Sequence, residues 1–147
     1  KPSESGYAHQ QATRPDTLAV ALTDSPAGLL SWLVEKYAAW GPGNRLEPYH
    51  PDEIITPVML YWMTRSIGTS FRAYSESGSG GPHPLITVPA SLFIQQHEAG
   101  YLRTLGEKSH RDIRAFEVLD RGGHFPAWKA PADIARAILA LEEAVNT

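Results

Sequence analysis

The second half of the chain holds two segments typical of β-strands, and two strands are too few for a sheet of their own. "LITVPASLFIQ" (85–95) is apolar and β-branched and predicts a buried strand, whereas "RDIRAFEVLD" (111–120) alternates polar and apolar residues. An amphipathic helix follows over about 131–145, with apolar residues at helical spacing at Ile134, Ile138 and Leu141. Strands joined in this way form parallel sheets, but two of them build no stable core. The pattern therefore predicts an α/β fold and the last quarter of a larger sheet.

The first half of the chain is predicted to be helical. One helix is expected to begin near Pro15 and a second at Asp24-Ser25-Pro26, a capping sequence followed by proline. A cap at Asp52 is expected to start one or two more helices. The second helix carries apolar residues on one side, at Leu29, Leu30, Leu33, Val34 and Tyr37. These helices are too apolar to be solvated all round, so they should pack against something large. The Gly/Ser/Pro-rich stretch 75–84 marks the change from helices to strands.

Charge and composition exclude several classes of function. The net charge of the 147 residues is -3 and they form no basic stripe, which argues against nucleic-acid binding. No stretch is apolar for long enough to span a bilayer, and the first residues lack the apolar core of a signal peptide. The absence of cysteine excludes disulfides and Cys-based metal sites and leaves the redox compartment open, so the cytoplasm is the default expectation.

Two candidate residues for catalysis follow the two predicted strands. His124 comes after Gly122 and Gly123 at the end of the second strand, and Glu98 follows the first strand after a short loop. The carboxyl ends of parallel strands share one edge of a sheet, where a carboxylate can orient an imidazole. The alternatives are a turn or surface histidine and a solvated glutamate. Asp112 and Asp120 compete with Glu98 for the role of the acid.

Tyrosine and histidine supply the remaining candidates. Tyr7 and Tyr74 could donate hydrogen bonds to a developing oxyanion if they converge, although most tyrosines are half-buried packing residues. The six histidines lack metal-ligand spacing and no HExxH motif occurs, so no metal site and no cofactor are expected.

Three segments together resemble a known family. "ESGYAHQQATRPDTLAVALTDSPAGLLSWLVEKYAAW", "TPVMLYWMTRSIGTSFRAYSES" and "RGGHFPAWKAPADIARAI" are similar to the microsomal-type epoxide hydrolases of the α/β-hydrolase superfamily. The likeness extends from about Ser5 to Leu141 and is densest in the first helices and around His124. It implies the C-terminal portion of an α/β-hydrolase fold, with part of a helical lid in 1–82 and the last part of the core in 83–147.

The resemblance also implies a two-step mechanism. An aspartate opens the epoxide and forms an ester, and a histidine then activates the water that releases a diol. His124 in "RGGHF" matches the base, Tyr7 and Tyr74 match the two lid tyrosines, and Glu98 falls where the family has its acid. The family usually has Phe-Pro shortly before that acid, whereas this chain has Gln-Gln-His at 95–97.

The motif that would carry the nucleophile is missing from the chain. No Gly-x-Asp-x-Gly elbow occurs, nor does the oxyanion-hole motif with His-Gly and Trp-Pro. The expected partner is therefore an N-terminal portion of the same hydrolase on a separate polypeptide, produced by cleavage in a lid loop or by a gene in two pieces. An isolated fragment is disfavoured, because it would expose a sheet edge and apolar helices. The other expected partners are a small-molecule epoxide and water, and the sequence is compatible with a homo-oligomer.

Two other functions remain open on the sequence. A haloalkane dehalogenase would use tryptophan-type halide donors and an esterase a serine nucleophile, and a non-catalytic protein would keep the fold without the chemistry. The tyrosine pair favours the epoxide. Wall residues of the predicted pocket suggest an apolar substrate: Trp32, Trp62 and Met59.

Overall fold

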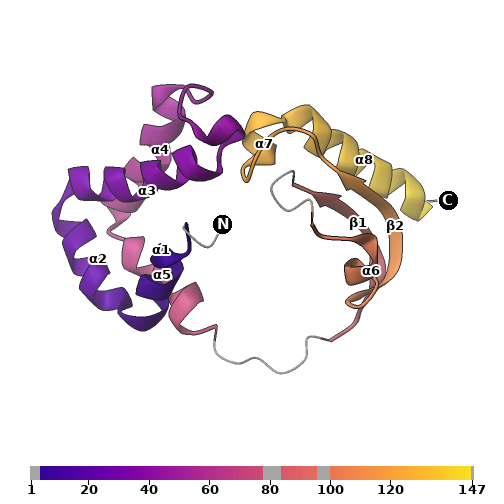
Figure 1. Ribbon diagram of the computed structural model, residues 1–147, viewed down its shortest axis with the longest axis horizontal. Coiled ribbons are helices and arrows are strands. Elements are labelled where there is room, and N and C mark those ends of the chain that lie inside the picture. The colour runs from indigo at the N-terminus through magenta and orange to yellow at the C-terminus, as the bar shows by residue number, and fades with distance from the viewer. Residues whose placement is uncertain (1–3, 78–83, 96–99, 147) are drawn as a thin grey trace. The chain divides into compact units, whose positions relative to one another are not determined.

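The computed structural model describes residues 4–77, 84–95 and 100–146, which form two compact units (Figure 1). The helical unit contains the described residues of 1–39 and 45–81, and the sheet unit contains 40–44 together with those of 82–147. The predicted boundary between 82 and 83 lies outside the described residues. That the first unit is a lid and the second a part of a hydrolase core stays a prediction.

Five α-helices are described in the helical unit: α1 (Gly6–Thr13), α2 (Pro15–Asp24), α3 (Pro26–Trp40), α4 (Pro51–Thr64) and α5 (Ile67–Ser75). The predicted starts of α2 and α3 are confirmed. Pro15 is the first residue of α2, and Ser25 Oγ accepts a hydrogen bond of 3.0 Å from the N–H of Gly28 in the first turn of α3. The sequence did not predict α1.

The start of α4 differs from the prediction. His50 is the N-cap instead of Asp52, and Pro51 is the first helical residue. The N–H of Asp52 donates to His50 Nδ1 at 3.3 Å, and the N–H of His50 donates to Glu53 Oε2 at 2.8 Å. These two bonds satisfy N–H groups that have no partner within the helix, which is why the helix begins earlier.

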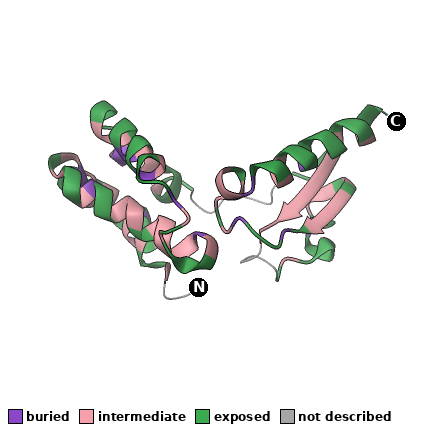
Figure 2. Ribbon diagram, turned by 90° about the horizontal axis from the view of Figure 1, so that it is seen from above, coloured by how far each residue is buried: buried purple, intermediate pink, exposed green. Residues whose placement is uncertain are grey.

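A small apolar core holds the helical unit together. Its buried members come from α2, α3, α4 and α5, and they are Leu22, Leu29, Val58, Ile67 and Phe71. On the surface, Arg72 donates from Nη2 to Oδ1 of Asp16 at 2.6 Å and so links α5 to α2. Figure 2 shows that the buried positions lie on the inner sides of these helices and that their outer sides are exposed.

The sheet unit contains two parallel strands and the helix α8. β1 (Ile86–Ile94) and β2 (His110–Val118) pair from Ile86 opposite His110 to Ile94 opposite Val118. The register shifts between Ile86 and Pro89 and again between Ala90 and Ser91, and Pro89 has no N–H for the ladder. The short α6 (Arg103–Gly106) precedes β2, and α7 (Pro126–Lys129) precedes α8 (Pro131–Asn146), which packs on both strands (Figure 1). Both predicted strands, their parallel order and the closing helix are confirmed.

One expectation about burial in the sheet unit is wrong. β1 was expected to be buried, but residues 86–88 are exposed and 89–94 are half-buried (Figure 2). On α8, Ile138 is 64% exposed, whereas the neighbouring Ala137 is buried. Among the described residues, α8 is the one long helix that covers these strands, so a large part of the apolar surface stays open.

Taken singly, none of the described helices is both long and apolar enough to cross a membrane. The pair α2 and α3 reaches that length and apolar character only together, and the two helices are bent by 119°.

Candidate functional site

The loop after β2 presents His124 through two glycines with positive φ. Gly122 has φ 98° and Gly123 has φ 59°, a region in which residues with a Cβ are strained. A Cβ on Gly122 would lie 2.9 Å from Cα of Pro126, and a Cβ on Gly123 would lie 2.7 Å from the carbonyl oxygen of Trp40. Both positions therefore require glycine, for conformation and for space.

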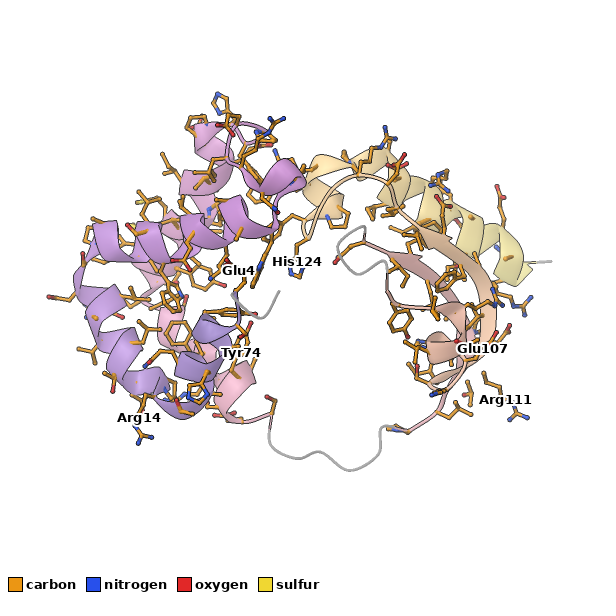
Figure 3. All side chains as sticks on the ribbon, viewed as in Figure 1. Glu4, Arg14, Tyr74, Glu107, Arg111 and His124 are labelled. Carbon is orange, nitrogen blue, oxygen red and sulfur yellow. The ribbon has the colours of Figure 1, made fainter. Side chains whose placement is uncertain are left out.

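His124 contacts the end of α3 in the sheet unit. Its N–H donates to the carbonyl oxygen of Trp40 at 2.8 Å. The imidazole and the indole of Trp40 have centroids 5.0 Å apart, and Phe125 meets the imidazole edge to face at 5.2 Å. The imidazole, exposed in this chain, projects from its loop (Figure 3). The glycines thus let the loop approach Trp40 closely, and the ring of His124 then lies beside two aromatic side chains.

An ion pair joins the same loop to α8. Arg121 donates to Asp133 from Nε at 2.7 Å and from Nη2 at 3.2 Å. Arg136, one turn further along α8, makes a bidentate contact with Glu117 of β2. Its Nη1 donates to Oε2 and its Nη2 to Oε1, both at 2.8 Å. Hydrogen bonds from Arg121 hold the pKa of Asp133 below its usual value, and those from Arg136 lower the pKa of Glu117. These contacts connect the histidine loop, β2 and α8.

The residue predicted to orient the histidine, Glu98, lies outside the described residues. The strand before it ends beside the strand before His124, because Ile94 pairs with Val118 and accepts a bond of 2.8 Å from the N–H of Leu119. Gln95, directly after β1, donates from Nε2 to the carbonyl oxygen of His124 at 3.4 Å. The segments that follow the two strands therefore begin at one edge of the sheet.

The two rival acids occupy different positions. Asp112 lies near the start of β2, opposite Pro89, and pairs with Arg114 at 2.8 Å. This is the opposite end of the strand from the histidine loop. Asp120 follows β2 and is exposed. The position of Asp112 makes it a poor candidate for orienting His124.

The two predicted tyrosines are in contact in the helical unit. Tyr7 of α1 and Tyr74 of α5 have ring centroids 5.7 Å apart and planes at 79°. Figure 3 labels Tyr74. Burial, a hydrogen bond with Tyr74 and the charge that Tyr74 would carry raise the pKa of Tyr7 to about 12. Lys36 Nζ lies 4.9 Å from the centroid of the Tyr7 ring and 3.6 Å from Glu4 Oε2. Tyr7 therefore stays protonated at neutral pH and keeps its ability to donate.

Comparisons with known proteins agree with the resemblance of the motifs. A juvenile hormone epoxide hydrolase from Bombyx mori is 38% identical over 152 residues, which are 92% of this chain and 33% of that protein. Epoxide hydrolase 1 from Sus scrofa is 34% identical over 150 residues, again 92% of this chain and 33% of that protein. The chain is a homologue of epoxide hydrolases. It spans about a third of the length of these relatives, and no family model matches it.

Solved structures place this epoxide hydrolase homologue in the α/β-hydrolase fold. The crystal structure of juvenile hormone epoxide hydrolase from Bombyx mori matches with a TM-score of 0.84 at 34% identity, over 97% of this chain and 41% of that chain. The Aspergillus niger epoxide hydrolase matches with a TM-score of 0.80 at 27% identity, over 96% of this chain and 36% of that chain. The predicted resemblance and fold class are confirmed.

The residues predicted to line the substrate pocket pack differently from one another. Trp32 contacts Phe71 at 6.3 Å between ring centroids, and both Trp32 and Trp62 pack against the core of the helical unit. Met59 of α4 is 44% exposed. For the two tryptophans, core packing accounts for their contacts in the described part of the epoxide hydrolase homologue, and the role of all three in binding stays a prediction.

Three residues near the candidate groups were not predicted from the sequence. Phe125 could have been found, because it directly follows His124 in the motif. Trp40 is the last residue of α3 and precedes Gly-Pro-Gly. That sequence predicts the end of a helix, but it does not predict that Trp40 contacts His124. Lys36 carries no signal, since a lysine on a helix is usually a solvated charge.

Proposed function

We propose that the chain is part of an epoxide hydrolase that opens an epoxide to a vicinal diol. The observation that carries the proposal is the loop of His124, whose two glycines with positive φ present one imidazole at the end of a strand in a homologue of epoxide hydrolases. An imidazole at this edge of an α/β sheet suits a general base.

In the proposed reaction, His124 acts in the second step. A carboxylate oxygen of an aspartate attacks one carbon of the epoxide, the C–O bond of the ring breaks, and an ester with a neighbouring alkoxide forms. His124 then takes a proton from a water molecule, whose oxygen attacks the ester carbonyl. When the tetrahedral intermediate collapses, the bond to the diol oxygen breaks and that oxygen takes the proton from His124. The diol leaves, the aspartate is restored, and the second proton of the water returns to the tyrosine. Glu98 would orient the imidazole and stabilise its protonated form.

Tyr7 and Tyr74 are proposed to act in the first step. Their phenols would donate hydrogen bonds to the epoxide oxygen and stabilise the alkoxide as the ring opens, and one of them would supply the proton. The edge-to-face contact of the two rings and the raised pKa of Tyr7 support this role, because a donor must be protonated at the working pH.

The nucleophilic aspartate would come from an N-terminal portion of the hydrolase. The chain has no Gly-x-Asp-x-Gly elbow and spans about a third of its curated relatives, which are single chains. The half-buried, two-stranded sheet supports the need for further strands. We infer that this portion is present, either on a separate polypeptide or in the same one.

The substrate is proposed to be an apolar epoxide. The relatives include enzymes named for juvenile hormone, and Trp32, Trp62 and Met59 would supply apolar surface. Assay of an aryl epoxide such as styrene oxide against a small polar epoxide tests this preference, and faster turnover of the polar compound would contradict it.

The first measurement is the intact mass of every polypeptide in the purified protein, under native and denaturing conditions. A second chain, or a longer chain, with a Gly-x-Asp-x-Gly elbow supports the proposal. A serine in that elbow would indicate an esterase instead. A single chain of 16.1 kDa that forms no diol would mean a non-catalytic homologue.

The second measurement detects the ester intermediate on the enzyme. In the complete enzyme, His124→Ala should still form the ester but not hydrolyse it, so the mass of the nucleophile-bearing chain rises by that of the epoxide. A single turnover of the wild type in ¹⁸O-water should label the enzyme and leave the diol unlabelled, because the first diol oxygen comes from the aspartate. Diol formation by His124→Ala at the wild-type rate would contradict the role of the histidine.

A further inference from the structure

The imidazole of His124 contacts two aromatic rings although it is exposed in this chain. The ring centroids of His124 and Trp40 are 5.0 Å apart with planes inclined by 58°, and those of His124 and Phe125 are 5.2 Å apart at 89°. Burial does not fix the orientation of this side chain. The contacts with Trp40 and Phe125 restrict rotation of the imidazole.

The backbone of Trp40 is held against the same loop. Its carbonyl oxygen accepts the N–H of His124 at 2.8 Å. Gly123 brings the loop so close to Trp40, Gly41 and Pro42 that a Cβ would lie within 2.7 to 3.0 Å of their backbone atoms. Residues 40–44 belong to the sheet unit, although Trp40 is the last residue of α3 and the rest of that helix belongs to the other unit. Trp40 thus reaches His124 through both its main chain and its ring.

We propose that Trp40 is a positioning residue, whose indole sets the direction of the His124 imidazole for hydrolysis of the ester. The catalytic role in this inference rests on the proposed function, whereas the contact between Trp40 and His124 does not depend on it. A base must point one ring nitrogen at the water and the other at its carboxylate, and misplacement by about 1 Å costs up to 100-fold in rate. The hydrogen bond fixes the backbone of His124, and the indole fixes the ring.

Substitution of Trp40 tests the contribution of its indole ring separately from that of its backbone carbonyl. Trp40→Leu removes the aromatic face but leaves the carbonyl that accepts the N–H of His124, whereas Trp40→Phe keeps an aromatic ring. In the complete enzyme, we expect Trp40→Leu to slow ester hydrolysis by roughly 10- to 100-fold, with the rate of ester formation and the KM for the epoxide unchanged. Trp40→Phe should recover most of that loss.

Nuclear magnetic resonance tests the contact without any reaction. The imidazole protons of His124 in the wild type should show a ring-current shift and a nuclear Overhauser effect to the indole of Trp40. The shift should disappear in Trp40→Leu and be partly kept in Trp40→Phe. If Trp40→Leu does not fold, the Overhauser effect in the wild type and the comparison with Trp40→Phe still decide the point.

The outcomes separate this inference from the proposed function. Imidazole signals that do not move in Trp40→Leu, or ester hydrolysis at the wild-type rate in that variant, would overturn the positioning role alone. A wild-type enzyme that shows the contact but forms no ester and no diol would contradict the proposed function, and with it the catalytic purpose of the contact.

Discussion

The phenol rings of Tyr7 and Tyr74 meet edge to face, with centroids 5.7 Å apart, although one belongs to α1 and the other to α5. A hydrogen bond joins the two side chains. Packing of α1 on α5 brings them together, so the pair is a product of the fold of the helical unit. Its chemistry can therefore be tested on each tyrosine separately.

The pKa of Tyr7 should fall in the variant Tyr74→Phe. Burial is the largest cause of the raised pKa of about 12, followed by the hydrogen bond and the charge interaction with Tyr74. Removal of the Tyr74 hydroxyl abolishes the last two causes, so the pKa should move toward 10 without reaching it. Titration of ¹³C-labelled tyrosine followed by nuclear magnetic resonance measures this. The control Tyr101→Phe, in the other unit, should leave Tyr7 unchanged.

The raised pKa of Tyr7 should make the stability of the protein depend on pH in the alkaline range. A phenol whose pKa is higher in the folded than in the unfolded protein stabilises the fold fully below pH 10 and loses that contribution as pH rises to about 12. The free energy of unfolding should therefore fall less steeply over this range in Tyr7→Phe, which has no proton to lose. Urea unfolding at several pH values checks this, and equal slopes for the two proteins would contradict it.

Single substitutions of the phenols should slow the first chemical step of the complete enzyme. Tyr7→Phe and Tyr74→Phe each remove one donor to the developing alkoxide, and we expect ester formation to slow about 100-fold in each. Ester hydrolysis should change little, in contrast to His124→Ala. Rapid-quench measurement of both steps tests the assignment, and an effect confined to hydrolysis would assign these residues to the wrong step.

Replacement of Gly123 by alanine should destabilise the protein. The positive φ of 59° costs a residue with a Cβ about 1–3 kcal/mol, and the added Cβ would lie 2.7 Å from the carbonyl oxygen of Trp40. Relief of that clash should also break the bond from the N–H of His124. Gly6→Ala is the matched control, since nothing lies within 4 Å of its added Cβ. Equal stability of the two variants, measured by urea unfolding, would be inconsistent with this account.

Periodic apolar residues explain why part of the fold could be predicted from the sequence. The two strands and α8 repeat apolar residues at spacings that indicate strand or helix, and Pro15 and Ser25 mark helix starts. The position of His124 after β2 followed from the glycines. α1 was missed because "GYAHQQAT" has few apolar residues, so its helical form depends on packing against α5 and α2.

Long-range contacts explain what could not be predicted. The partners of His124 and Tyr7 lie far away in the sequence, at Trp40 and Tyr74, and no spacing rule connects such residues. The exposure of β1 and of Ile138 depends on how many layers cover the sheet, which a local pattern does not state.

Truncation of Phe71 should have the largest effect on stability of the substitutions in the helical unit. Phe71 is 1% exposed, lies in the core cluster and contacts Trp32. Phe71→Ala removes a buried aromatic ring and leaves a cavity, which typically costs about 3–5 kcal/mol. The control Met63→Ala, at a position that is 74% exposed, should change stability by less than about 0.5 kcal/mol. Similar losses in both variants would indicate that the core lies elsewhere.

The ion pair of Arg121 and Asp133 should stabilise the histidine loop in a manner that depends on salt and pH. Arg121→Gln and Asp133→Asn should each lower the melting temperature. The double variant should lower it by less than the sum of the two single effects, because either single variant already breaks the two contacts of 2.7 and 3.2 Å between these side chains. Arg111→Gln, which removes the same charge from an exposed position on β2, is the control.

The sign of the pH effect follows from the pKa of Asp133. Arg121 lowers that pKa below its ordinary value of 3.8, so the contribution to stability is present above this pH and is lost as the pH falls through the folded pKa. The difference in melting temperature between wild type and Asp133→Asn should therefore shrink in acid. It should also shrink at high salt, since the Arg121 side chain is exposed and its charge is screened. A difference that grows in acid would mean that Asp133 stabilises the start of α8 by some means other than its charge.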